Sequence, residues 1–476
     1  MSSRNENLIK NVLLFAIGNI GSKLLQIILV PIYTRVMSSA EYGTVDIMQS
    51  IVSLLIPIFS FTIYEAVFRY AMEKEYDKKA IFSTGIVVSA IGGILLCLCG
   101  SIATLFIDPI FVWLVVANTF FGFVRSMLSQ YSKAVDKTVL YTVDSVLITV
   151  CVLILNIIFI IQFKWGINGY MIGYILANLI SCVFLYVCLG KFRKISFKSI
   201  SKPIIKEMIR FSIPLIPNGV CWWISSFIDR LIVTGVEGDA ANGLYAAGHK
   251  IPSLLTVIVT IFFQAWQMSA NQEFKKNDIA DFYREIHDQI FSVITLVSSF
   301  LILFCKPITS VFLGEEYFDA WQVMPFLLVS TSFFSYAQFL GSIYTANKKT
   351  GMALITNLIG VCISLTVNIL LVAIFKIGII GSAIASVCTY LVLWYSRIVT
   401  TNRIVPIKYN KNKMTITTVI LVIQATIVTF SKNDFLSYSA STISLIALII
   451  IFSKDIINLV KFGYGFVAGF LKKKKI

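Results

Sequence analysis

The sequence predicts an all-α polytopic membrane protein with about fourteen transmembrane helices. Three observations support this fold class: an apolar composition, continuous apolar runs, and an internal repeat. Of 476 residues, 57% are hydrophobic and 13% are charged, whereas soluble proteins carry about 25% charged residues. The mean hydropathy is +0.85. The repeat predicts two six-helix lobes related by a parallel pseudo-two-fold axis, followed by two C-terminal helices.

The apolar runs are continuous and reach about 20 residues, which is the length that an α-helix needs to cross the hydrocarbon core of a bilayer. Short polar loops separate them. The predicted spans are residues 8–35, 43–69, 80–106, 109–132, 138–162, 166–189, 208–235, 240–269, 285–305, 320–346, 350–374, 378–401, 414–431 and 437–453.

Orientation follows from Lys and Arg, which concentrate in cytoplasmic loops. With the N-terminus placed in the cytoplasm, most of the 40 Lys and Arg fall in inside segments. Those at outer span ends are Arg35, Lys164, Lys306, Lys376 and Lys432. Because the number of spans is even, we expect both termini on the cytoplasmic side of the membrane.

The formal net charge of +16 would suggest nucleic acid in a soluble protein, but here the basic residues occupy short loops between spans. We therefore expect no nucleic-acid partner. The nine cysteines fall inside predicted spans and lack the spacing of a metal site or disulfide framework. No phosphate-binding glycine loop is present. We predict neither cofactor nor metal, and because no outer loop could hold a catalytic domain, we predict no enzyme.

The chain repeats itself at two constant offsets. In the first, Tyr42-Gly43 recurs as Asn242-Gly243, and in the second, the segment that begins at Lys164 recurs from Lys376. Transporters built from such repeats place the substrate site between the two halves. The predicted division is an N-lobe at 1–190, a basic cytoplasmic linker at 191–207, a C-lobe at 208–402, two further spans at 403–454 and a basic cytoplasmic tail at 455–476.

Polar residues at helical spacing mark one face on the first, second and fourth spans and on the seventh, eighth and tenth. Taken singly, Ser and Thr are ordinary packing residues between membrane helices. The six spans occupy near-equivalent positions in the two halves, however. That match favours a shared polar cavity over six independent packing seams.

Charged residues inside spans set the predicted sign of this cavity, because a charge at a helix centre costs about 2.5–3.5 kcal/mol on insertion scales. Arg210 and Arg397 lie close enough to span ends for their head groups to reach the membrane interface, so they are not candidates. The candidate substrate-binding cations lie deeper: Lys23, Arg125, Arg230 and Lys250.

Polar and aromatic residues on the same faces would complete the cavity: Asn19, Gln26, Asp229, Trp222, Trp223, His249 and Gln338. Asp229 can instead pair with a neighbouring cation, and the tryptophans can pack as well as stack on sugars. A lone histidine such as His249 is more often a packing residue than a ligand. Prolines inside spans remove a helix hydrogen bond and allow hinges or static kinks; they are Pro57, Pro214, Pro217, Pro252 and Pro325.

Several of these residues belong to short motifs that follow one another along the chain. They are Asn19, Pro31, Tyr33, Arg35, Tyr42-Gly43, Ser212-Ile-Pro214-Leu-Ile-Pro217-Asn218, Asp229-Arg230, Gly243-Leu-Tyr245 and Lys250-Ile-Pro252. Over essentially its whole length the chain resembles the Wzx-type flippases of polysaccharide repeat units, such as those of capsule or O-antigen. These belong to the multidrug/oligosaccharidyl-lipid/polysaccharide exporter superfamily.

This resemblance implies a MATE-like fold of two lobes around a central cavity. It also implies that an undecaprenyl-pyrophosphate-linked oligosaccharide moves from the inner to the outer leaflet, in contact with membrane lipids. A polysaccharide polymerase and glycosyltransferases of the same process would be partners. A net cationic cavity suits an anionic pyrophosphate and a hydroxyl-rich sugar.

Two other function classes remain as alternatives. A MATE-type, cation-coupled multidrug antiporter would share the fold, but its cationic drugs would favour a cavity dominated by acids. A membrane enzyme of glycan assembly is disfavoured by the short outer loops. Drug efflux would indicate the first alternative, and glycosyl transfer or polymerisation by the purified protein the second.

Overall fold

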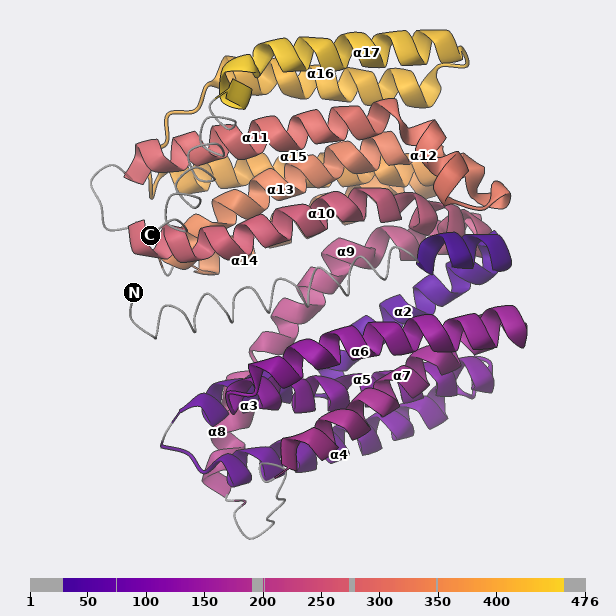
Figure 1. Ribbon diagram of the computed structural model, residues 1–476, viewed down its shortest axis with the longest axis vertical. Helices are drawn as coiled ribbons and strands as arrows, with labels where there is room; N and C mark the ends of the chain where they lie inside the picture. Colours follow the sequence, from indigo (N-terminus) through magenta and orange to yellow (C-terminus); the bar gives the residue numbers. More distant parts are fainter. Residues whose placement is uncertain are drawn as a thin grey trace, which may run out of the picture. The chain divides into compact units, whose positions relative to one another are not determined.

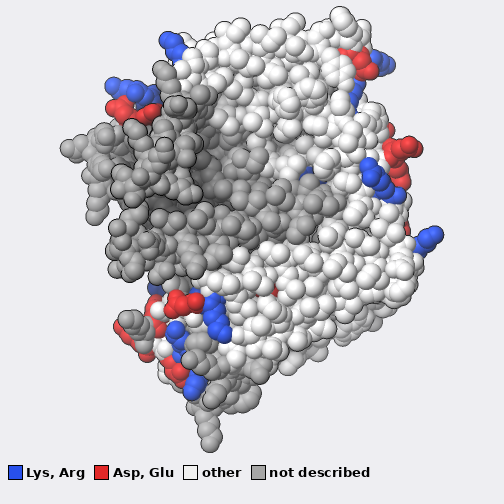
Figure 2. Space-filling model, in the orientation of Figure 1, with Lys and Arg blue, Asp and Glu red and all other residues white. Residues whose placement is uncertain are grey.

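The computed structural model is built of helices in the part of the chain that it describes. The described residues are 29–73, 75–190, 200, 202–273, 279–347 and 350–457. Within them, eleven helices are long and apolar enough to cross a membrane. Figure 2 shows the charged side chains gathered at helix ends, with broad uncharged flanks between them. The predicted class, an all-α polytopic membrane protein, is confirmed; the count of fourteen spans stays a prediction.

Contacts divide the chain into two compact units. The first unit comprises residues 1–234 and 238–243, and the second comprises 235–237 and 244–476. The sequence repeat predicts a division near residue 207, whereas by contacts the segment up to Thr234 packs with the first unit. The reason is that side chains of this segment bond to the first unit: Trp223 donates to the carbonyl of Ser50, and Arg230 donates to Asp46.

The helices described in the first unit are, in chain order, α2 (Ser39–Phe59), α3 (Ile63–Met72), α4 (Lys78–Ala103), α5 (Pro109–Ala134), α6 (Thr138–Asn156), the π-helix η1 (Ile157–Gln162), α7 (Gly166–Leu189), α8 (Lys202–Ser212) and α9 (Leu215–Glu237). Of these, α4, α5, α6 and α7 run side by side in Figure 1.

Helix α10 (Asp239–Glu273) begins in the first unit and continues into the second. The second unit also holds α11 (Ile279–Leu303), α12 (Cys305–Phe312), the 3-10 helix η4 (Glu315–Gln322), α13 (Met324–Ala346), α14 (Thr350–Asn368), the π-helix η5 (Ile369–Ile374), α15 (Ile379–Asn402), α16 (Lys411–Phe430) and α17 (Asp434–Ile451).

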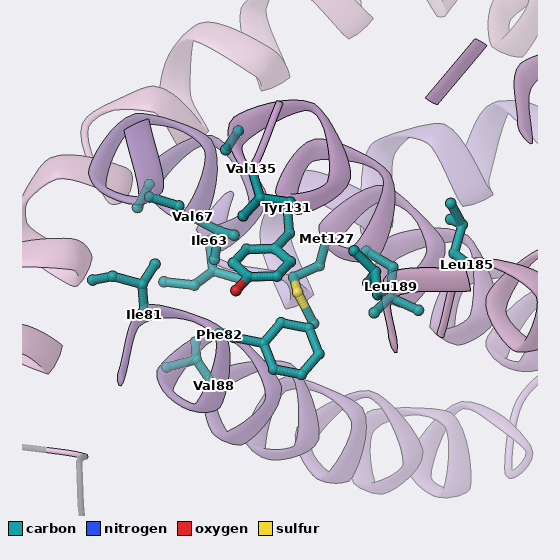
Figure 3. Close-up of a cluster of buried hydrophobic side chains, with 14 of the residues drawn as sticks. Ile63, Val67, Ile81, Phe82, Val88, Met127, Tyr131, Val135, Leu185 and Leu189 are labelled. Carbon is teal, nitrogen blue, oxygen red and sulfur yellow. The ribbon is translucent and has the colours of Figure 1, made fainter. Parts of the chain in front are cut away.

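An apolar cluster of buried side chains lies at the end of the first unit that is predicted to be cytoplasmic (Figure 3). Tyr131 of α5 and Phe82 of α4 are fully buried, and their ring centroids lie 4.7 Å apart. Met208 of α8 joins the same cluster, so the short amphipathic helix packs its apolar face on α3 and α4. The hydroxyl of Tyr76 donates to Glu207 at 3.0 Å, and this hydrogen bond raises the pKa of Tyr76.

The repeat that relates Lys164 to Lys376 is confirmed by backbone geometry. Helices α6 and α14 begin and end at residues related by this same offset, and each passes directly into a π-helix of six residues. The turn that follows contains Lys164 or Lys376, with φ of 55° and 52°, and then Gly166 or Gly378, with φ of 50° and 71°. A left-handed lysine is uncommon, so its occurrence at both places shows that the same turn was duplicated.

The repeat that relates Gly43 to Gly243 appears as a reciprocal close contact inside the first unit. A Cβ on Gly43 of α2 would lie 1.8 Å from the carbonyl oxygen of Asp239, and one on Gly243 of α10 would lie 1.9 Å from that of Ser39. Asn242 Nδ2 also donates to the Gly43 carbonyl at 3.0 Å. Both positions require glycine because the two backbones approach too closely for any side chain.

The predicted hinge in the second span corresponds to a break in the helix. Helix α2 ends two residues after Pro57, and Phe61 and Thr62 adopt φ of 52° and 47° before α3 begins. Thr62 Oγ1 donates to the carbonyl of Ser212 at 2.7 Å, which ties the break to the end of α8.

The other prolines divide into two kinds. Pro252 lies inside α10, whereas Pro214 precedes the first residue of α9 and Pro217 lies in its first turn. For Pro214, Pro217 and Pro325 the expected interior position is wrong, because α9 begins at Leu215 and α13 begins at Met324. A proline there removes no helix hydrogen bond, since the first N–H groups have no intrahelical partner. Their roles as hinges stay predictions.

Candidate functional site

Arg125 lies in an ion pair that joins three helices of the first unit. Its Nη2 donates to Asp144 Oδ2 of α6 at 2.8 Å, and its Nε donates to Ser181 Oγ of α7 at 2.9 Å. Ser181 in turn donates to Asp144 Oδ1. The Asp144 side chain is fully buried, and that of Arg125 is 22% exposed. We call Arg125, Asp144 and Ser181 the first arginine junction.

The sequence singled out Arg125 but did not identify Asp144 as its partner. Arg125 lies about 14 Å along the axis of α5 from the end of that helix at Ala134, at a rise of about 1.5 Å per residue. Ser181 carries no signal in the sequence, because serine is common in membrane helices for packing reasons. Only the rotation and approach of α5, α6 and α7 bring the three side chains together.

Arg230 links α9 to α2 within the first unit. Its Nη1 lies 3.4 Å from both carboxylate oxygens of Asp46, and the guanidinium sits 4.9 Å from the ring centroid of Phe227. Arg230 is 9% exposed. Its neighbour Asp229 accepts a hydrogen bond from the Arg230 backbone N–H at 2.9 Å. Arg230 therefore faces a carboxylate at a loose distance, with an aromatic ring beside it.

Trp223 fixes the same pair of helices closer to the middle of α9. Its Nε1 donates to the backbone carbonyl of Ser50 at 2.7 Å, and the residue is 7% exposed. Gly219, one turn earlier, faces Pro57 of α2. In this structure the indole packs between helices, so stacking on a sugar would require it to be uncovered. Beside it, the Trp222 side chain lies outside the described residues.

Lys250 and His249 lie on α10 and are both half-buried. The His249 ring lies 6.4 Å from that of Tyr245, whose hydroxyl is 3.4 Å from Ser386 Oγ in α15. Gln338 of α13 is half-buried, and its Oε1 has no hydrogen-bond partner among the described residues. These side chains are positioned by the second unit. Three further candidates lie outside the described residues: Asn19, Lys23 and Gln26.

The expectation for Arg397 is wrong: the side chain does not extend to the membrane interface. Arg397 is 8% exposed and donates to the Ala337 carbonyl at 2.6 Å, to Asn357 Oδ1 at 2.9 Å and to Thr356 Oγ1 at 3.4 Å. Nearness to a helix end does not decide where a long side chain points when neighbouring helices offer it acceptors. We call Arg397, Ala337, Thr356 and Asn357 the second arginine junction.

Among the described residues no group of three or more His, Cys, Asp or Glu side chains could hold a metal ion. Within the described spans of the first unit, Arg125 pairs with Asp144 and Arg230 faces Asp46. Both of these arginines are therefore placed beside a carboxylate.

Residues 8–267 match the family described as polysaccharide biosynthesis protein, which covers more than half of the chain. The chain belongs to this family. It is 24% identical over 286 residues to the probable lipid II flippase MurJ of Rickettsia prowazekii, covering 57% of this chain and 54% of that protein. It is 23% identical over 263 residues to the Lsg locus putative protein 1 of Haemophilus influenzae, covering 54% and 63%. The matches thus span only part of the length of these two relatives.

Solved structures of transporters share the fold of this family member. A lipid II flippase MurJ in an inward closed conformation superimposes with a TM-score of 0.69 at 15% identity, covering 94% of this chain and 100% of that one. An inward-facing multidrug resistance MATE transporter gives 0.62 at 15%, covering 81% and 98%. A Pyrococcus furiosus transporter of the MOP superfamily gives 0.60 at 14%, covering 83% and 96%. The MATE-like fold of a multi-pass membrane protein is thereby confirmed.

Proposed function

We propose that this protein is a flippase that moves an undecaprenyl-pyrophosphate-linked oligosaccharide from the inner to the outer leaflet by alternating access. The product would supply capsular or related surface polysaccharide. Membership of the polysaccharide biosynthesis family and the fold shared with a lipid II flippase support this class of cargo. We place the protein in the bacterial plasma membrane with both termini in the cytoplasm.

The observation that carries the proposal is the presence of two arginines, Arg125 and Arg230, within membrane helices of the first unit. Arg125 pairs with Asp144 and is 22% exposed, and Arg230 lies beside Asp46 with a side chain that is 11% exposed. Arginine is costly at that depth, and its planar fork of N–H donors matches the oxygens of a phosphate. Together with Lys23 and Lys250 they would bind the pyrophosphate, and Asn19, Gln26, Asp229 and Gln338 would face the sugars.

The test is leaflet exchange in proteoliposomes that contain the full-length protein and a fluorescent undecaprenyl-pyrophosphate oligosaccharide. We expect wild-type protein to accelerate exchange. Replacing Lys23, Arg230 or Lys250 singly by Ala should lower the rate by about tenfold or more, because a charge-assisted contact to the diphosphate is lost. Arg210→Ala is the matched control, since Arg210 is exposed on α8.

Distinct outcomes would contradict distinct parts of the proposal. Full exchange by all three variants would show that these cations do not bind the cargo. Absence of exchange by wild-type protein, accompanied by export of cationic drugs, would instead indicate an antiporter of the MATE type. Glycosyl transfer by the purified protein would indicate an enzyme of glycan assembly.

A further inference from the structure

The first arginine junction contains a titratable group that the proposed function leaves unused. Both oxygens of Asp144 are engaged, one by Arg125 and the other by Ser181, and the carboxylate has no solvent exposure. Arg125 is 22% exposed, and its Nη1 has no hydrogen-bond partner among the described residues. A ligand can therefore reach the guanidinium without first reaching the carboxylate.

We propose that Arg125 and Asp144 form a proton-linked anion site. When a diphosphate binds the Arg125 guanidinium, Asp144 takes up one proton. When the diphosphate dissociates, Asp144 releases the proton and the ion pair with Arg125 forms again. This inference rests on the proposed function and adds to it the ion that is coupled to cargo binding. Asp144 acts here as a positioning residue, because it holds Arg125 and does not touch the cargo.

When a diphosphate replaces Asp144 on Arg125, the carboxylate is left without its cation. A phosphate competes with a carboxylate for the same guanidinium donors. The carboxylate that is displaced stays fully buried, and an isolated ionised carboxylate is so costly there that it becomes neutral instead. The proton is drawn from water on the side from which the cargo enters. As the O–H bond forms on Asp144, one O–H bond of a hydronium ion in that water breaks, and no other covalent bond changes.

The surroundings of Asp144 offer no substitute cation among the described residues. Helix α7 carries no charged residue, and Asp144 is the one charged residue of α6. Helix α5 carries Arg125 and Lys133, and the Lys133 Nζ lies over the rings of Phe68 and Tyr141 at 4.8 and 5.5 Å. The other titratable groups that face Asp144 are Tyr141, Cys151 and Cys182. None of these three becomes positively charged, so Arg125 is the group that keeps Asp144 ionised.

The second arginine junction supplies the contrast within the same chain. Arg397 donates to a backbone carbonyl, a threonine hydroxyl and an asparagine amide. None of these acceptors takes up a proton near neutral pH. In the repeat that relates α6 to α14, Thr356 stands at the position of Asp144. Thr356→Asp therefore places a carboxylate beside an arginine that the proposal does not assign to the cargo.

The test measures how many protons the protein takes up when it binds a diphosphate ligand. The purified full-length protein would be titrated calorimetrically with a short-chain prenyl diphosphate linked to a sugar, in two buffers of different ionisation enthalpy. We expect wild-type protein and Thr356→Asp to take up close to one proton per ligand. Affinity should then rise as pH falls, by at most about tenfold per pH unit. Asp144→Asn should bind without proton uptake and with a flat pH profile.

If Asp144→Asn does not reach the membrane, Ser181→Ala replaces it. Ser181 donates to the ionised carboxylate, so its removal favours the protonated form and should move the pH dependence of binding to higher pH. Binding by wild-type protein without proton uptake, or equal uptake by Asp144→Asn, would overturn the coupling while leaving the flippase intact. Absence of both binding and leaflet exchange would overturn the proposed function and the coupling together.

Discussion

Two groups of three helices, one in each unit, are related by the repeat, and each group holds an arginine in a different way. In the first unit α5, α6 and α7 surround Arg125, and in the second α13, α14 and α15 surround Arg397. In the repeat that relates α6 to α14, Ala337 takes the place of Arg125, and its carbonyl accepts from Arg397. The arginine thus comes from the fourth helix of the first repeat but from the sixth helix of the second.

The difference concerns the counter-charge. The first arginine junction is an ion pair and is neutral as a whole, whereas among the described residues the second places an arginine against neutral acceptors. A duplicated scaffold can therefore keep an arginine at the same helix junction while changing which helix supplies it. Whether that junction responds to protons and anions depends on the side chain at the position of Asp144 or Thr356.

The largest effect is expected from removing the carboxylate of the first arginine junction. Asp144→Ala leaves Arg125 without its partner, which should lower the free energy of unfolding by about 3–5 kcal/mol. Thermal unfolding of the purified protein in detergent measures this. The double variant Arg125→Met with Asp144→Leu should recover most of that loss yet fail in leaflet exchange. An unchanged stability for Asp144→Ala would mean that the pair does not hold the three helices together.

A smaller effect is expected at the second arginine junction. Asn357→Ala removes one neutral acceptor from Arg397 and leaves two, so the free energy of unfolding should fall by about 1.5–3 kcal/mol. The same unfolding measurement applies, with Asn410→Ala as a control that removes only a cap at the start of α16. A loss larger than that of Asp144→Ala would reverse the proposed ranking of the two junctions.

A third effect is expected at the close contact of Gly43 with Gly243, where equivalent glycines of the two repeats each face a backbone carbonyl of the other repeat. Gly43→Ala and Gly243→Ala should each lower the free energy of unfolding by about 1–3 kcal/mol, because the new Cβ would overlap a carbonyl oxygen. Gly235→Ala is the control, since nothing lies within 4 Å of a Cβ there. Equal stability of all three variants in thermal unfolding would show that the two backbones separate easily.

The smallest effect is expected from converting the second junction into the first. Thr356→Asp adds a carboxylate beside Arg397, but the cost of burying it offsets the new attraction, so stability should change by less than about 1 kcal/mol. Leaflet exchange should be unaffected. A large gain in stability would show that the missing counter-charge had been limiting the second unit.

The sequence by itself determined the fold class, because apolar runs of about 20 residues and the repeat are local properties of the chain. Even the left-handed turns at Lys164 and Lys376 follow a motif that recurs in the sequence. The depth of Arg125 and Arg230 could also be predicted, since position along a helix fixes depth.

The tertiary structure decided which charges meet. Asp144 lies 19 residues from Arg125 and Ser181 lies 56 residues from it, so their contact depends on how three helices are rotated about their axes. For the same reason Arg397 turns inward to acceptors on α13 and α14, although it lies near a helix end. Helical periodicity gives the face on which a residue lies, and only packing determines what that face meets.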